Sequence, residues 1–152
     1  NSIFNLNLGV EKKEVSSARH WVYFPEKQTC FFRSGFPHNF SSTVTPRGRG
    51  SLYIEVAYSK SKPIDKNSIV SSIKEDLIKV GLLKKESRIF CQDVNDIKYG
   101  YPIYDMYYSQ ARAKIIKYLT RNNIMPCGRY GAWSYFSMED SILDGKRVAS
   151  LL

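Results

Sequence analysis

The sequence has few of the residues that bind metals or form disulfides. It contains three cysteines and two histidines, and no pair of cysteines has the C-x-x-C spacing. An odd number of widely spaced cysteines argues against a disulfide framework, and so few ligands argue against a structural zinc site. The scarcity of histidine also argues against a Cys–His or Ser–His nucleophilic centre. We therefore expect no metal site, and three reduced thiols in a cytoplasmic protein.

Long apolar runs and glycine-rich nucleotide motifs are also missing. No apolar run approaches the ~20 residues that a membrane-spanning helix needs, so we expect no membrane span. The G-x-G-x-x-G motif that opens a dinucleotide-binding βαβ unit is absent as well. Gly48 and Gly50 come nearest, but they lie in a Pro-Arg turn instead of between a strand and a helix.

Acidic residues are fewer than basic ones, which gives the chain a net charge of +9. A basic module that stacks nucleic-acid bases on exposed tyrosines is one alternative that this charge raises. The lysines and arginines are scattered along the chain, however, and none cluster on a recognition element. We therefore do not expect nucleic acid as a partner, and we expect the lysine and arginine side chains to lie on solvent-exposed surfaces.

Apolar and aromatic patterning predicts an α+β fold. Strands are expected near residues 3–8, 21–24, 30–33, 52–58 and 88–97, where β-branched and aromatic residues gather. The short, turn-forming connections between the early strands favour antiparallel pairing. The predicted fold is an antiparallel β-sheet with helices packed on one face, ending in a strand, a turn and a helix.

Helical spacing of apolar residues predicts three helices, over residues 67–80, 109–121 and 138–151. In the second helix we expect Ala111, Ile115, Tyr118 and Leu119 to point inward, and Arg112, Lys114 and Lys117 to point outward. A short strand at residues 124–127 is expected to lead into the turn before the last helix.

The last helix combines a capping signal with a face of small residues. Ser137 is a good N-cap, and Asp140 three residues later completes a weak capping box. Ser141, Gly145 and Ala149 recur at helical spacing, so one helix face carries almost no side chains. A Gly-Arg turn before such a helix suits a phosphate-bearing cofactor at its open N-terminus. A tight helix–sheet contact without a ligand is the alternative.

Residues 127–147 resemble the C-terminal FAD-binding motif of the flavin amine-oxidase superfamily, in its protoporphyrinogen-oxidase-like and UDP-galactopyranose-mutase-like branches. The matching positions are Gly128, Arg129, Gly131, Trp133, Tyr135, Met138, Ile142 and Gly145. Glu139 departs from the motif, because aspartate is usual there. Looser counterparts lie at residues 24–26, 36–41, 48–52 and 101–104.

The resemblance implies FAD as the cofactor and assigns residues to two sides of a site. The implied cofactor-binding residues are Gly128, Arg129, Tyr130, Gly131, Ser137, Met138, Glu139 and Ile142. The implied substrate-side residues are Tyr101, Tyr104, Trp133, Tyr135 and Arg33. Arg33 lies in a predicted strand, where it faces either a ligand cavity or solvent. Catalytic residues are not assigned.

The resemblance also implies a domain organisation. Residues 1–104 are expected to form a substrate-side sheet domain, and residues 105–152 a return segment that completes an FAD-binding domain. The dinucleotide-binding part of that domain is absent from the sequence, which also starts without methionine. We expect the chain to be the C-terminal fragment of a longer flavoprotein, with that missing domain as its partner. The fragment alone is not expected to retain FAD or activity.

The implied function is that of an FAD-dependent oxidoreductase acting on a small molecule. An isomerase similar to UDP-galactopyranose mutase, acting on a nucleotide sugar in cell-surface polysaccharide biosynthesis, is the alternative. In the mutase family the motif reads Tyr-x-Asp-Met-Asp, whereas residues 135–139 read Tyr-Phe-Ser-Met-Glu. Replacement of the first aspartate by Ser137 puts the mutase reaction in doubt.

Overall fold

The computed structural model describes residues 1–15 and 18–151. It divides the chain into two compact units, Asn1–Gly100 (unit 1) and Tyr101–Leu152 (unit 2). From the sequence we placed the domain boundary after residue 104. That the second unit completes an FAD-binding domain stays a prediction.

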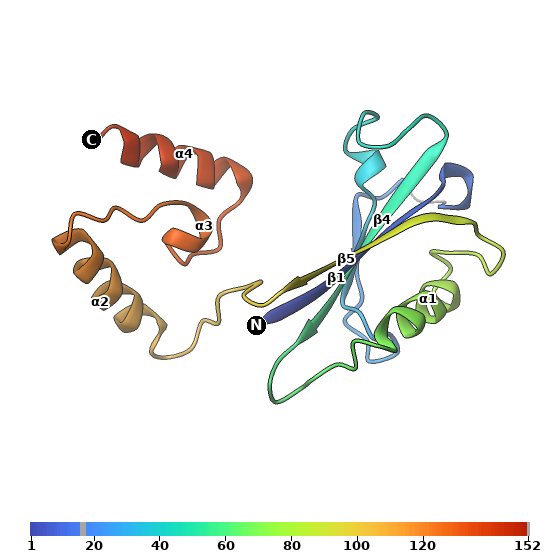
Figure 1. Cartoon of the computed structure of the whole chain (residues 1–152), viewed down its shortest axis with the longest axis horizontal. Coiled ribbons are helices and arrows are strands. Elements are labelled where there is room, and N and C mark those ends of the chain that lie inside the picture. Colours follow the sequence, from blue (N-terminus) through green and yellow to red (C-terminus); the bar gives the residue numbers. More distant parts are fainter. Residues whose placement is uncertain (16–17, 152) are drawn as a thin grey trace. The chain divides into compact units, whose positions relative to one another are not determined.

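Unit 1 is built on a five-stranded antiparallel sheet with the strand order β2-β3-β4-β1-β5 (Figure 1). The strands are β1 (Ser2–Glu11), β2 (Trp21–Tyr23), β3 (Arg33–Gly35), β4 (Arg49–Tyr58) and β5 (Ile89–Ile97). The two longest strands, β1 and β4, pair along their whole length, from Ser2 opposite Tyr58 to Glu11 opposite Arg49. Short 3-10 helices η1 (Lys12–Glu14) and η2 (Pro37–Asn39) follow β1 and β3.

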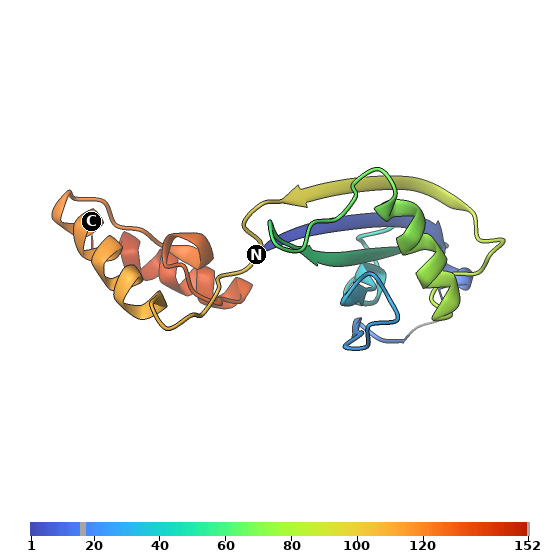
Figure 2. The same ribbon diagram turned by 90° about the horizontal axis from the view of Figure 1, so that it is seen from below.

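One face of this sheet is apolar and carries the core. Alternate residues of β1, including Leu6, Leu8 and Val10, are buried because successive side chains of a strand point to opposite faces. Helix α1 (Ile69–Lys79) covers this face and buries Ile73 and Leu77 in the same cluster (Figures 1 and 2). The α+β fold predicted from the sequence is therefore confirmed, with an antiparallel sheet and a helix packed on one face.

The strand predicted at residues 30–33 is shifted in the structure. The ladder with β2 and β4 begins only at Arg33 and runs to Gly35. Phe31 is buried in the core before the strand starts. Phe31 and Phe32 therefore belong to the loop that enters the strand, and of the predicted range only Arg33 lies in the strand itself.

Unit 2 contains three helices: α2 (Tyr108–Arg121), the single turn α3 (Gly128–Gly131) and α4 (Met138–Ala149). The strand predicted at residues 124–127 is wrong, because these residues form no ladder. A strand needs a neighbouring strand to satisfy its backbone groups. Unit 2 offers none within its described residues, 101–151.

The inward face predicted for α2 is also largely wrong. Ala111, Ile115 and Tyr118 are exposed, whereas Arg112 is half-buried. Arg112 donates from Nε to the Ala132 carbonyl at 2.5 Å, and Tyr108, one turn earlier, donates to the Trp133 carbonyl. These two side chains anchor the 132–133 segment, and the more apolar stripe of the helix stays uncovered.

Within the described part of unit 2, only two apolar residues, Ala132 and Val148, are buried. None of the helices in the described parts of the chain is long and apolar enough to span a membrane.

Candidate functional site

In unit 2, Arg129 lies against two of the predicted substrate-side tyrosines. Its Cζ atom is 4.8 Å from the ring centroid of Tyr135 and 5.2 Å from that of Tyr101. The two rings are stacked, with centroids 6.4 Å apart and planes inclined by 21°. Arg129 also donates from Nη1 to the Phe136 carbonyl at 3.2 Å. The structure thus joins a predicted cofactor residue with two predicted substrate residues in one cluster, here called the Arg129 cluster.

The turn that carries Arg129 is fixed by Gly128. Gly128 has a φ of +72°, which favours glycine, and a Cβ there would meet no atom within 4 Å. Its N–H donates to Asp144 Oδ2 at 2.9 Å. This bond, and then the hydrogen bond from Arg147, hold the pKa of Asp144 below its ordinary value. The sequence analysis did not identify Asp144 as the residue that holds this turn. The only signal was its position three residues before Arg147, a spacing that allows an ion pair on one helix face.

The N-terminus of α4 is capped as the sequence predicted. Ser137 Oγ accepts from the Asp140 N–H at 3.1 Å, and the Asp140 carboxylate accepts from the Ser137 N–H at 2.8 Å. The Asp140 carboxylate also accepts from the Ser137 hydroxyl at 2.7 Å. The bonds that it accepts from the Ser137 N–H and hydroxyl lower the pKa of Asp140. Ser137 is therefore engaged in the cap, and the open donors of this helix end are the N–H groups of the first turn, at Met138 and Glu139.

Helix α4 has a face of small residues, which includes Ser141 and Gly145, and two apolar side chains, Met138 and Ile142, that are more exposed. A Cβ at Gly145 would meet nothing within 4 Å, and the Ser141 hydroxyl folds back onto the Ser137 carbonyl. Met138 is 86% exposed and Ile142 is 70% exposed. Met138 and Ile142 are therefore uncovered within the described residues of unit 2, whereas Ser141 and Gly145 of the small-residue face are half-buried.

The loop between α3 and α4 holds Trp133 in an unusual backbone conformation. Its φ is +46°, in the left-handed region that bulky residues rarely adopt. The Tyr130 ring, which is itself exposed, lies 6.0 Å from the Trp133 ring.

Gly131 allows the close approach of Pro126, because a Cβ at position 131 would lie 3.2 Å from the Pro126 carbonyl carbon. Tyr104 packs on the edge of Tyr108 instead of joining the Arg129 cluster.

In unit 1, Arg33 lies on the sheet face opposite α1, in a polar cluster here called the Arg33 cluster. It contacts Glu55 Oε1 at 2.5 Å from Nη2 and donates from Nη1 to the Tyr23 hydroxyl at 3.3 Å. Its Cζ atom lies 5.4 Å from the Tyr53 ring centroid. Gly35 makes room for that ring, because a Cβ there would lie 2.1 Å from it. Burial raises the pKa of Tyr53, although the nearby Arg33 charge opposes this.

Glu55 was missed by sequence reasoning, although a signal was present. It is the single acidic residue within the apolar run of residues 52–58, and it is buried with only 9% of its surface exposed. Buried carboxylates are normally paired, so an arginine opposite it was the natural expectation. The register pairs Arg33 with Glu55.

Cysteine, histidine and carboxylate side chains do not gather into a group of three or more that could hold a metal ion in residues 1–15 and 18–151. The three cysteines are free thiols. Burial, followed by the Asp76 carboxylate, raises the pKa of Cys30 to about 12.

No family model matches the chain. Among solved structures, the chain is similar to a crystal structure of reduced UDP-galactopyranose mutase, with a TM-score of 0.78 and 28% sequence identity. The match covers 88% of this chain and 29% of that chain. The chain therefore spans less than a third of the length of the mutase structure. This similarity supports the α+β fold. Of the two branches that the sequence resembles, it supports the UDP-galactopyranose-mutase-like one.

Proposed function

We propose that this chain is part of an FAD-dependent enzyme similar to UDP-galactopyranose mutase, acting on a nucleotide sugar. The observation that carries this proposal is the similarity to the reduced mutase over 88% of the chain, at 28% identity. In this proposal unit 1 supplies a substrate-side sheet, and unit 2 supplies one side of the FAD site.

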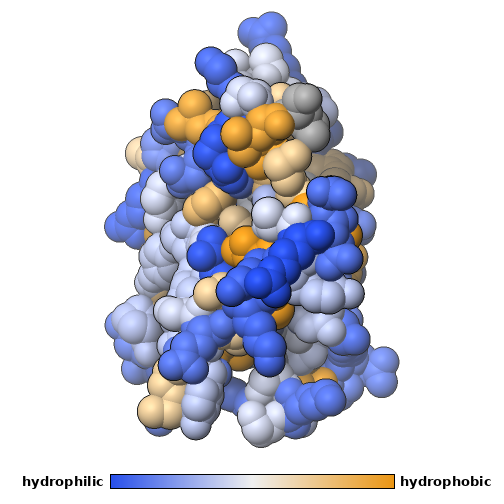
Figure 3. All heavy atoms as spheres, turned by 90° about the vertical axis from the view of Figure 1, so that its left-hand side faces the viewer, coloured by the Kyte–Doolittle hydropathy of each residue, from blue (hydrophilic) through white to orange (hydrophobic). Residues whose placement is uncertain are grey.

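The proposal needs a further domain, and the packing of unit 2 supports that need. Unit 2 buries little apolar surface, which is a weak basis for independent stability. Apolar side chains exposed in this unit include Ile103, Met106, Ile115, Tyr118, Met138, Ile142 and Leu143. Figure 3 views the side that carries α2 and α4 and shows apolar residues among hydrophilic ones. A dinucleotide-binding domain would cover such residues and offer residues 124–127 a strand to pair with.

The residues near α3 and α4 fit an anionic, flat cofactor such as FAD. The Gly128 backbone is open on its Cβ side, so a ligand can approach the turn closely. Arg129 offers a guanidinium that the Phe136 carbonyl and two tyrosine rings already orient. The first turn of α4 offers N–H groups and a positive partial charge. When bound, FAD would supply the redox or covalent chemistry, and these residues would bind and orient it.

On the substrate side, Arg33 is the residue with the chemistry to bind a nucleotide-sugar diphosphate. Guanidinium groups bind phosphate oxygens with two parallel hydrogen bonds. Glu55 and the tyrosines around Arg33 hold its guanidinium on the open sheet face. A diphosphate would compete with the Glu55 carboxylate for this charge.

An FAD-dependent oxidoreductase is the second candidate, and Ser137 is the observation that favours it. The mutase motif has an aspartate at this position, whereas Ser137 is bound up in the helix cap. Without that carboxylate, the chain lacks one group that the mutase resemblance assigns to the substrate. Oxidation of the substrate, with its two electrons passing through the bound flavin to an external acceptor, would then replace isomerisation.

The test uses the full-length polypeptide that contains residues 1–152. The purified protein should show flavin absorbance, and the chemically reduced enzyme should convert UDP-galactopyranose to its furanose isomer. Flavin absorbance without furanose, together with substrate-dependent flavin reduction, would support the oxidoreductase instead. A protein that neither carries nor takes up FAD would contradict both candidates.

A further inference from the structure

The most exposed apolar side chains of unit 1 gather at one end of its sheet. Within residues 1–15 and 18–100, three large apolar residues other than tyrosine are at least half exposed: Trp21, Phe40 and Val44, at 50%, 54% and 54%. Trp21 begins β2, and the other two lie in the loop that leads into β4. The pairing of β2, β3 and β4 places all three where β4 begins. Scattered apolar residues on a surface are normal, whereas a group of them marks an interaction site.

Two of these side chains form a stack. The ring centroids of Trp21 and Phe40 lie 5.8 Å apart, and the ring planes are inclined by 13°. The His20 ring meets Phe40 edge-on, with centroids 4.7 Å apart. Because each ring of the stack already has the other on one face, the pair offers a continuous apolar surface and no slot for a third ring between them.

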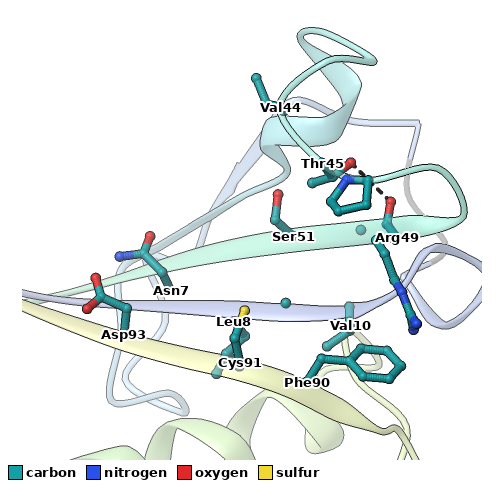
Figure 4. Close-up of a pocket in the computed structure, with 13 residues that line it drawn as sticks. Asn7, Leu8, Val10, Val44, Thr45, Arg49, Ser51, Phe90, Cys91 and Asp93 are labelled. Carbon is teal, nitrogen blue, oxygen red and sulfur yellow. Dashed lines mark hydrogen bonds between the residues drawn. The ribbon is translucent and has the colours of Figure 1, made fainter.

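The loop that carries Val44 is ordered by its own hydrogen bonds. The Thr45 hydroxyl donates to the Arg49 carbonyl at 3.1 Å, and the Arg49 N–H donates to the Pro46 carbonyl at 3.0 Å. Figure 4 shows this loop beside the strands, with the Val44 side chain directed away from them. An apolar side chain that is held outward in this way costs little further ordering when a partner covers it.

Basic residues that are far apart in the sequence meet around this apolar group. The Lys12 N–H donates to the Gly48 carbonyl at 3.0 Å, which joins the end of β1 to the loop before β4. The Arg19 carbonyl accepts from Asn39 Nδ2 at 2.7 Å, one residue before Phe40. The exposed basic residues that these contacts bring together are Lys12, Lys13, Arg19 and Arg47. These four residues and the three apolar ones are here called the docking end.

Acidic residues do not neutralise the docking end. Among residues 12–15, 18–21 and 36–50, Glu14 is the single acidic residue, and it is half-buried. Glu11 is already paired with Arg49, with Oε1 and Nη1 2.6 Å apart. The docking end is therefore positively charged, although the lysines and arginines that form it are scattered in the sequence.

We propose that the docking end binds the surface of a bilayer that contains anionic lipids. Interfacial membrane contacts combine apolar and aromatic side chains, which enter the boundary between headgroups and acyl chains, with lysine and arginine near the lipid phosphates. A nucleic acid would use the same cations, but it would leave Val44 and the stacked rings without a role. This proposal does not rest on the proposed function, because it uses only residues of unit 1.

Cosedimentation with lipid vesicles tests the proposal on the full-length polypeptide. Vesicles of phosphatidylcholine with about 30% phosphatidylglycerol should bind it at least about tenfold more tightly than vesicles of phosphatidylcholine alone. Most of this binding should be lost in about 0.5 M salt, which screens the lipid charge. Equal binding to the two kinds of vesicle, or none to either, would overturn the proposal.

Charge reversal locates the contact. The double variant Lys12→Glu, Arg47→Glu should weaken binding to the anionic vesicles about twenty-fivefold or more, about fivefold for each cation lost. Lys60→Glu, Lys62→Glu is the matched control, because these exposed lysines follow the other end of β4. Ten residues of strand span about 34 Å, which is several Debye lengths at physiological salt. The control should change binding less than about twofold, and equal losses in the two double variants would overturn the location.

Apolar substitutions separate a bilayer from other polyanions. Phe40→Ser and Val44→Ser should each weaken vesicle binding about fivefold, because roughly 40 Å² of apolar surface no longer leaves water. Val94→Ser is the matched control for Val44→Ser, since Val94 is an exposed valine of β5 outside the docking end, and it should bind as the unchanged protein does. If Phe40→Ser fails to fold by circular dichroism, Val44→Ser still decides. Unchanged vesicle binding in the apolar variants, with single-stranded RNA bound as tightly as the vesicles, would overturn the bilayer in favour of a general polyanion site.

Discussion

The guanidinium of Arg129 lies 4.8 Å from the ring centroid of Tyr135. The carbonyl of the following residue, Phe136, accepts a hydrogen bond from the same guanidinium. Arg129 and Tyr135 are thus joined twice across the loop between α3 and α4. Because these contacts exist within unit 2 alone, the positive charge is oriented before any ligand arrives.

The capping box of α4 gives a prediction about stability. Ser137→Ala should destabilise unit 2 by about 1 kcal/mol, the usual cost of losing an N-cap side chain. Ser137→Asp should recover only part of this loss, because aspartate also caps but cannot donate to the Asp140 carboxylate as the Ser137 hydroxyl does. Trp133 and Trp21 are the two tryptophans of the chain and lie one in each unit. Trp133 fluorescence during urea unfolding, in a Trp21→Phe background, therefore reports on unit 2.

The same pair of variants separates the two candidate functions in the full-length enzyme. Ser137→Asp restores the aspartate of the mutase motif, so it should raise furanose formation if the site is mutase-like. Ser137→Ala should not. No gain in Ser137→Asp, in an enzyme that binds FAD normally, would favour the oxidoreductase.

The two aspartates of α4 predict an acid-sensitive loop. Hydrogen bonds from Ser137 to Asp140, and from Gly128 and Arg147 to Asp144, lower both pKa values below the ordinary 3.8. The stability that they contribute is therefore present above pH 3.8 and is lost as the pH falls through the lowered pKa values.

Amide resonances of Gly128 and Ser137 measure this directly, because these N–H groups donate to the two carboxylates. Both resonances should shift as the pH falls below 3.8. Asp144→Asn should abolish the shift at Gly128 and leave that at Ser137 intact. If the Gly128 resonance still shifted with pH in Asp144→Asn, the Asp144 carboxylate would not be the acceptor of the Gly128 N–H.

The Arg33–Glu55 pair should contribute more to stability than a more exposed ion pair. Arg33 and Glu55 side chains are 20% and 11% exposed, whereas those of Arg49 and Glu11 are 38% and 32% exposed. Glu55→Gln removes the carboxylate that balances the largely buried Arg33 charge and should cost about 2 kcal/mol. Glu11→Gln, the matched control, should cost about 0.5 kcal/mol.

Urea unfolding followed by Trp21 fluorescence, in a Trp133→Phe background, reports on unit 1 for both variants. Equal losses in Glu55→Gln and Glu11→Gln would mean that burial does not strengthen the Arg33 pair. Smaller losses at high salt are expected for Glu11→Gln, because exposed pairs are screened.

Cys30 should be the least reactive thiol of the chain. Its pKa is raised to about 12 by burial and by Asp76, and only the thiolate is alkylated. At pH 8, Cys30 should react with iodoacetamide at least about a hundredfold more slowly than Cys127. Asp76→Asn should speed the reaction of Cys30, since it removes the neighbouring carboxylate. Comparable alkylation rates at Cys30 and Cys127 would contradict the raised pKa of Cys30 and its burial beside Asp76.

Local sequence signals predicted the elements whose partners lie close in the chain or inside the same unit. The gathering of β-branched and aromatic residues identified β1 and β4, and the capping pair Ser137 and Asp140 marked the start of α4 within one residue. These features depend on short-range chemistry, so the sequence contains them in full.

The failures share a different physical origin. Residues 124–127 have a strand-like composition but no neighbouring strand in the unit, and α2 turns Arg112 instead of Ile115 towards the rest of unit 2. Both predictions assumed partners that the described residues of this unit do not supply. The lone acidic residue in the apolar run of β4 indicated that Glu55 needs a buried partner, but which residue pairs with it depends on the register between β3 and β4, which no local pattern specifies.

The central claim is that this chain supplies one side of an FAD site, and Arg129 tests it most directly. A charge-assisted contact to a phosphate is worth about 1.5–3 kcal/mol. In the full-length enzyme, flavin titration of Arg129→Ala should therefore give an FAD affinity about tenfold or more below that of the unchanged protein. Arg129→Lys should recover only part of the loss, because an ammonium group cannot reproduce the guanidinium fork. Unchanged FAD affinity in Arg129→Ala, with the fold intact, would contradict the claim and reduce the Arg129 cluster to a structural turn.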